Sequence, residues 1–117
     1  MVVLNDLKPG LDEKLYERAL LLELRAQGAK IDQQKRFGVF YRGEEIGHLI
    51  PDLIVDEAVI VDAKVAEDFN EAHVAQMIGY LAITKLQLGL LVNFKHHKLQ
   101  WKRVVRENRP ANPRESA

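Results

Sequence analysis

The chain is organised around the stretch Pro51-Asp52-Leu53-Ile54-Val55-Asp56-Glu57-Ala58-Val59-Ile60-Val61-Asp62-Ala63-Lys64. It reads as two short apolar strands joined by an acidic turn, with three charged residues where a buried strand favours Val or Ile: Asp52, Asp62 and Lys64. Strand side chains alternate between faces, so Asp62 and Lys64 project from the same side, about 7 Å apart along the strand. Two strands that carry charges on one face are therefore the first structural prediction.

The position of Asp52 depends on the hairpin register. Asp52 joins the other two charges only if it pairs opposite Asp62, which requires an odd number of loop residues, such as 56–58. A two-residue turn at Asp56-Glu57 would place Asp52 on the opposite face, because a slip of one residue turns every side chain over. Both registers remain open at this point.

The charges lie in apolar surroundings. One parity carries Ile50, Ile54 and Ile60, and the other carries Leu53, Val55, Val59, Val61 and Val65. A strand pair that is apolar on both faces is normally covered on both sides, and an unpaired charge there costs several kcal/mol. The charges therefore form either an Asp–Lys ion pair at the margin of the sheet or a divalent-cation site. Mg²⁺ takes one or two carboxylates, keeps several waters and accepts phosphate oxygens.

Pro51-Asp52 followed ten residues later by Asp62-Ala63-Lys64 resembles the signature of the PD-(D/E)XK nuclease superfamily. The segment 10–16, Gly-Leu-Asp-Glu-Lys-Leu-Tyr, resembles the GxxExxY motif of one small-protein family within it. Segments 16–25, 34–35, 73–81 and 89–94 also look like that family in order and spacing, so the resemblance spans about Leu4 to Phe94. Asp62 stands where the family more often has Glu, and only Met1 to Lys8 stands where its members usually carry a helix.

This resemblance implies a metal-dependent phosphodiester hydrolase that acts on nucleic acid, with DNA as the expected substrate. Asp52 and Asp62 would bind Mg²⁺ or Mn²⁺, with the backbone carbonyl of Ala63 as a further ligand. Lys64 would position the attacking water or stabilise developing negative charge. The resemblance also favours Glu13 and Gln76 as members of the water network.

Several of these residues have simpler interpretations. Glu13 and Glu17 are four residues apart on one helix face, and the sequence alone favours two solvated acids near the positive end of the helix dipole. His73, Gln76 and Tyr80 fall at i, i+3 and i+7, so they form one stripe on a second helix. That stripe is either part of the site or a solvated helix edge, and Tyr80 either caps the pocket or packs.

Basic residues are concentrated at 95–106, a stretch without an acid until Glu107. Contacts with the phosphate backbone are expected from these and from two residues at the start of the strand predicted near 36–41: Lys35, Arg36, Lys95, Lys98, Lys102 and Arg103. The whole chain has a formal net charge of zero, so its overall charge does not indicate nucleic-acid binding.

Length and composition limit the possibilities. A chain of 117 residues with 47% hydrophobic and 29% charged residues is expected to form one globular domain. We predict a nuclease-like domain over 1–106 and a disordered tail over 107–117. The absence of cysteine excludes disulfides and thiolate zinc sites and is typical of a cytoplasmic protein. No apolar run suits a transmembrane helix, so no membrane association is expected.

The pattern predicts a helix from about Leu11 to Gln27, strands near 36–41 and at the opening stretch, a helix over 71–86, and strands at 88–94 and 99–105. Helix, three strands, helix, two strands is an α/β arrangement with a mixed sheet flanked by helices. The resemblance implies the restriction-endonuclease-like αβββαβ core.

Two other functions remain possible. A catalytically inactive binding or assembly module on the same fold would pair Asp52 directly with Lys64 and leave no room for a metal. Alternatively, the chain would be a nuclease subunit that acts only as a homodimer or with a partner protein.

Overall fold

The computed structural model describes residues 7–106, which form two helices and seven strands. The helices are α2 (Glu13–Ala26) and α3 (Glu71–Thr84). The strands are β1 (Ile31–Gln33), β2 (Phe37–Tyr41), β3 (Glu44–Leu49), β4 (Leu53–Val55), β5 (Val59–Lys64), β6 (Leu88–Asn93) and β7 (Gln100–Val105).

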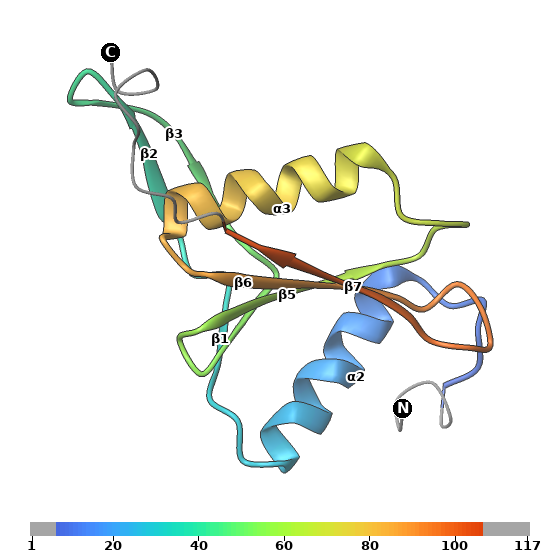
Figure 1. Cartoon of the computed structure of the whole chain (residues 1–117). Helices are drawn as coiled ribbons and strands as arrows, with labels where there is room; N and C mark the ends of the chain where they lie inside the picture. The colour runs from blue at the N-terminus through green and yellow to red at the C-terminus, as the bar shows by residue number, and fades with distance from the viewer. Residues whose placement is uncertain (1–6, 107–117) are drawn as a thin grey trace.

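Five strands form one mixed sheet in the order β1-β4-β5-β6-β7, and α2 and α3 cover its two faces (Figure 1). Strands β5 and β6 are parallel, with α3 as the connection between them, and the other pairs are antiparallel. A parallel pair requires such a long crossover, whereas antiparallel neighbours can be joined by short turns. The predicted fold class, a mixed α/β sheet flanked by helices, is confirmed.

The β4–β5 hairpin adopts the register that brings the acids together. Leu53 pairs with Val61 and Val55 with Val59, which leaves a three-residue loop at 56–58. Asp56 and Glu57 both have positive φ, 53° and 58°. Contacts with the start of β1 hold this loop: the Asp56 carboxylate accepts from the Lys30 backbone N–H at 2.8 Å, and the Asp56 N–H donates to the Lys30 carbonyl at 2.7 Å.

Apolar residues of opposite strand parity form two separate clusters. On the α2 side, Tyr16 and Phe94 stack with their ring centroids 4.8 Å apart and pack with Leu53, Val61 and Ala63. On the α3 side, the buried residues are Ile54, Ile60, Met77, Leu81, Leu91 and Val104. The predicted division of the central strands into two apolar faces is confirmed, and the even-numbered face of β5 is the one under α3.

The close approach of α3 to the sheet depends on Gly89. A Cβ atom at this position would lie 2.3 Å from the Met77 sulfur, so any larger residue would displace the Met77 side chain, which packs between α3 and the sheet. A tight packing distance here keeps the α3 side chains within reach of the central strands.

The segment before β4 differs from the sequence prediction. Three strands were expected before the second helix, whereas five are present. Strand β1 was too short to show a pattern. Strand β3, which ends at Leu49, was not distinguished from β4, which begins at Leu53. Pro51 is buried between β3 and β4 and has no N–H to donate to a ladder, which separates the two strands. Strands β2 and β3 form their own two-stranded sheet, with a tight turn at Arg42 and Gly43, both at positive φ.

The predicted tail, 107–117, lies outside the described residues, as does most of the segment before Lys8. Neither described helix is long and apolar enough to cross a membrane.

Candidate active site

Asp52 and Asp62 meet on the α3 face of the sheet. Asp62 is only 4% exposed, and Asp52, directly before β4, is half-buried. Burial raises the pKa of Asp52 to about 8; a hydrogen bond with Asp62 and the negative charges of Asp62 and Glu17 act in the same direction, and Lys14 opposes them. At neutral pH the protonated form of the Asp52 carboxyl is therefore favoured, because burial and the neighbouring negative charges oppose its ionisation.

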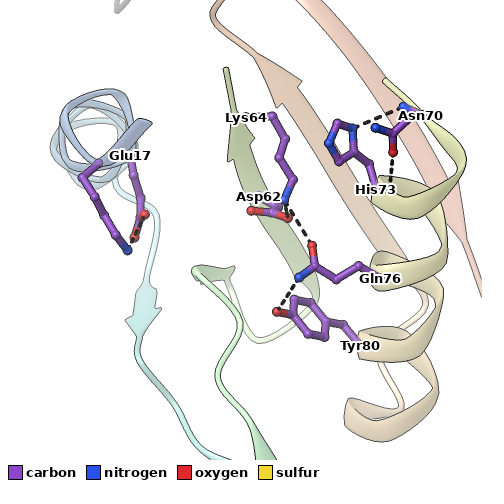
Figure 2. Close-up of polar contacts among 8 residues, drawn as sticks. Glu17, Asp62, Lys64, Asn70, His73, Gln76 and Tyr80 are labelled. Carbon is purple, nitrogen blue, oxygen red and sulfur yellow. Dashed lines mark hydrogen bonds and ion pairs between the residues drawn. The ribbon is translucent and has the colours of Figure 1, made fainter. Parts of the chain in front are cut away.

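Lys64 lies against the same pair. Its ammonium Nζ is 3.2 Å from Asp62 Oδ2 and donates to Gln76 Oε1 at 3.1 Å. The Gln76 amide in turn donates to the Tyr80 hydroxyl at 3.2 Å. Figure 2 shows Gln76 and Tyr80 reaching from α3 towards the end of β5, where Lys64 bends back over Asp62. The helical stripe that contains Gln76 is therefore joined to the charged strand residues.

The helix acid beside the pair is Glu17 rather than Glu13. Glu17 is 5% exposed, forms an ion pair with Lys14 at 3.5 Å, and contributes to the raised pKa of Asp52. Glu13 is half-buried in the first turn of α2. Figure 2 places Glu17 across from Asp62, on the side opposite α3. The expectation of a solvated Glu17 is thus corrected: Glu17 follows the buried Tyr16 and precedes Leu20 and Leu21 at helical spacing, which was the available signal.

His73 has a structural contact. Its Nδ1 accepts from the Asn70 backbone N–H at 3.2 Å, and the Asn70 side chain accepts from the His73 N–H at 2.9 Å. These reciprocal bonds form a capping box at the start of α3. His73 therefore anchors the helix that carries Gln76, and Figure 2 shows it turned towards Asn70.

The loop between β5 and α3 is fixed to β6 by Asn93, which is fully buried. Its side chain accepts from the Ala66 N–H at 3.1 Å and donates to the Ala66 carbonyl at 2.7 Å. Gln100 extends this network to Asp68 at 2.6 Å. The position of α3 relative to Lys64 is thus set by hydrogen bonds from two further strands.

The donor set suits a hard divalent cation. Two neighbouring carboxyl groups present oxygen ligands, and a bound cation would favour the ionised form of Asp52. Mg²⁺ needs only one or two carboxylates. The β4–β5 ladder ends at Leu53–Val61, so Ala63 has no β4 residue opposite it. Over residues 7–106, no cluster of three or more His, Cys, Asp or Glu has the geometry of a complete metal site. Any such cation would therefore keep waters or substrate oxygens as further ligands.

The predicted phosphate-binding residues are not gathered on one surface. Lys35 lies over the Phe37 ring at 5.6 Å, and Arg36 pairs with Glu45 at 2.7 Å. Lys102 and Arg103 are consecutive on β7 and so point to opposite faces, with Lys102 beside α3. Lys95 is 3.7 Å from Glu67, and Lys98 is exposed in the β6–β7 loop.

A mixed sheet with an acid pair and a lysine on its central strands is the arrangement that the resemblance to a nuclease superfamily implies. Comparison by sequence agrees: the profile of the PD-(D/E)XK nuclease superfamily matches residues 1–104. The chain therefore belongs to the PD-(D/E)XK nuclease superfamily, whose members typically use divalent metals. No curated protein matches the chain.

Solved structures show the same fold. The alkaline exonuclease LHK-Exo from Laribacter hongkongensis is similar with a TM-score of 0.60 and 14% identity, over 81% of this chain and 56% of that one. Its complex with dAMP has a TM-score of 0.62, also at 14% identity, with the same 81% and 56% coverage. The structure of SSO0001 has a TM-score of 0.64 at 13% identity, over 80% of this chain and 49% of that one. The chain thus spans about half the length of these proteins.

Proposed function

We propose that this chain is a divalent-metal-dependent phosphodiesterase that cleaves nucleic acid, with DNA as its substrate. The observation that carries the proposal is the β4–β5 register, which brings Asp52 opposite Asp62, with Lys64 3.2 Å from Asp62, in a member of a nuclease superfamily. DNA is favoured because the similar exonuclease has been crystallised with dAMP, a deoxyribonucleotide. The narrower GxxExxY assignment remains a prediction.

Asp52 and Asp62 would hold Mg²⁺ or Mn²⁺, with the Ala63 carbonyl as a further ligand. A bound divalent cation lowers the pKa of a coordinated water and stabilises negative charge on a phosphate. Asp52 would release its proton on binding, since the cation replaces the proton as the partner of the two carboxylates. Glu17, in place of Glu13, would accept hydrogen bonds from water on the α2 side.

Lys64 would donate to the attacking water or to a phosphate oxygen, because its ammonium already lies beside Asp62 at 3.2 Å. Gln76 would hold the ammonium in this orientation through its 3.1 Å hydrogen bond, and Tyr80 would fix the Gln76 amide. The site thus combines ligands from β4 and β5 with orienting groups from α3.

The inactive-module alternative predicted a direct Asp52–Lys64 ion pair. Among the described residues Lys64 pairs with Asp62 instead, and Asp52 is hydrogen-bonded to Asp62. This arrangement favours the enzyme. Activity that requires a homodimer or a partner protein remains a further proposal, which sedimentation of the active species would test.

The direct test measures cleavage of single- and double-stranded DNA and RNA by wild type, Asp62→Asn and Asp12→Asn, with Mg²⁺, Mn²⁺ or EDTA. Asp12→Asn is the matched control, because Asp12 is an exposed acid whose side chain makes no capping hydrogen bond. We expect metal-dependent DNA cleavage that Asp62→Asn lowers on the order of a thousandfold, through the loss of several kcal/mol of transition-state stabilisation. Nucleic-acid binding without cleavage under every metal condition would instead establish the inactive module.

A further inference from the structure

The β2–β3 hairpin stands apart from the sheet that carries the acid pair and projects beyond the end of α3 (Figure 1). It is attached at its base by Phe37, which packs against the apolar cluster under α3. Every residue of β3 except Leu49 is exposed. Two-stranded hairpins are marginally stable in water, so large apolar side chains displayed on one need an explanation other than folding.

Among these side chains, Phe40 has a position that its neighbours define. It is 64% exposed, and its ring lies over Gly38: a Cβ atom on Gly38 would be 2.9 Å from Phe40 Cε2 and also 2.9 Å from Glu45 Oε1. Arg36 donates to that same Glu45 oxygen at 2.7 Å. Gly38 and Phe40 lie on one face of β2, and the bond to Glu45 brings Arg36, which precedes the strand, to the same face. An aromatic ring and a guanidinium are therefore held side by side above a strand position without a side chain.

We propose that this face binds single-stranded nucleic acid, with an unpaired base stacked on Phe40 and the neighbouring phosphate on the Arg36 guanidinium. Aromatic rings stack on unpaired bases of any sequence, whereas the bases of a duplex already stack on one another. The single bond from Arg36 to Glu45 leaves further guanidinium donors for a phosphate. The inference rests on the proposed function and adds that the substrate is single-stranded.

The alternative occupant, a second copy of the chain, fits the hairpin less well. Its large exposed apolar side chains are Phe40, Tyr41 and Ile46. At roughly 150–250 Å² for a large aromatic, these fall short of the ~800 Å² per partner in a standard interface. Four charged residues near them, Arg36, Arg42, Glu44 and Glu45, would also lose water in a protein interface.

The hairpin also leads directly into the acid pair. Glu45 pairs with Phe40, and seven residues further along the chain is Asp52. At ~3.3 Å per residue this separation is at most about 23 Å. That span corresponds to about seven nucleotides or fewer at ~3.4 Å each in a stacked strand. A strand bound at Phe40 would thus reach the acid pair within about seven nucleotides.

The test uses fluorescence anisotropy with the full chain carrying Asp62→Asn, in EDTA, and a labelled fifteen-nucleotide single strand. Phe40→Ala should weaken binding about five- to a hundredfold, the range for loss of one base–aromatic stack, and Phe40→Trp should retain it. Tyr41→Ala is the matched control, since Tyr41 is 65% exposed on the opposite face of the same strand.

A second pair of variants leaves every aromatic residue in place. Gly38→Ala must displace the Phe40 ring or the Glu45 carboxylate, whereas a Cβ on Gly47, in the opposite strand, meets nothing within 4 Å. Gly38→Ala should therefore weaken single-strand binding and Gly47→Ala should not. Thermal melting of each variant checks that the fold is retained.

Three results would overturn the inference: no measurable single-strand binding at low salt, an equal loss for Phe40→Ala and Tyr41→Ala, or a change of oligomeric state with Phe40→Ala in sedimentation. Binding is measured without metal or cleavage. Phe40-dependent binding by a wild-type chain that never cleaves would therefore overturn the proposed function alone. If wild type and Phe40→Ala cleave long single strands equally well in the presence of metal, only the inference is overturned.

Discussion

The central strands and the β2–β3 hairpin differ in which side chains they bury: the central strands bury a charged residue, and the hairpin exposes aromatic residues. On β4 and β5 the chain buries Asp62 among apolar neighbours and brings Asp52 against it, while on the hairpin it exposes Phe40 and Tyr41 to solvent. Both arrangements oppose folding, since charges are stabilised by water and aromatic rings by its exclusion. Such local departures from the folding optimum are typical of functional sites.

The two regions also differ in how they are supported. The acid pair is surrounded by the five-stranded sheet, both helices and the Asn93 network, whereas the hairpin is attached at its base through Phe37. Rigid support suits ligands that must hold one geometry, and a projecting arm suits a surface that accepts bases of any sequence.

The largest difference is expected in folding stability, for the same substitution made in both regions. Phe94 is fully buried and stacked on Tyr16, so Phe94→Ala should lower the free energy of unfolding by about 3–5 kcal/mol. Phe40→Ala should change it by about 0.5 kcal/mol or less, as for an exposed surface site. Urea denaturation followed by circular dichroism measures both values. A loss of similar size for the two variants would mean that the hairpin is an integral part of the core.

A second prediction concerns the link from α3 to the acid pair. Gln76→Ala removes the acceptor 3.1 Å from Lys64 Nζ, so kcat should fall about ten- to a hundredfold, as expected for loss of an orienting contact, while divalent-cation binding is retained. Gln27→Ala, an exposed glutamine next to the end of α2, is the control. Steady-state kinetics and metal titration separate the effects, and an equal fall in metal affinity would place Gln76 among the ligands instead.

A third prediction concerns the pH dependence of stability in the metal-free protein. Since the pKa of Asp52 is raised to about 8, the folded chain binds more protons than the unfolded chain between about pH 4 and pH 8. Stability should therefore fall as pH rises through this range, by several degrees in Tm. Asp52→Asn should flatten the profile between pH 5 and pH 8.5 in scanning calorimetry. A wild-type profile as flat as that of Asp52→Asn would show that Asp52 ionises normally.

Much of the fold could be predicted from periodicity. The alternation of apolar residues around Asp62 predicted both faces of the sheet, and the helical stripes predicted α2 and α3. Strand parity predicted that Asp62 and Lys64 share a face, but it left two registers for Asp52. The choice between them depends on loop 56–58 and its hydrogen bonds to Lys30, a contact between segments far apart in the chain.

The burial of Glu17 was hidden for a similar reason. Glu13 and Glu17 share a helix face, and the family resemblance selected Glu13 by its place in a motif. Which acid is buried depends on the rotation of α2 about its axis, which the stacking of Tyr16 on Phe94 helps to set. The outward position of β2 and β3 was likewise hidden, because the strand pattern around Phe40 does not say which sheet the strand joins.

The central claim is that Asp52 and Asp62 act as one divalent-cation site. Isothermal titration with Mn²⁺ of wild type, Asp62→Asn and the exposed control Asp12→Asn tests it directly, and repetition in buffers of different ionisation enthalpy counts the protons released. The account predicts saturable binding with proton release at pH 7 for wild type and Asp12→Asn, and loss of both for Asp62→Asn. Equal Mn²⁺ binding by all three proteins, without proton release, would contradict it.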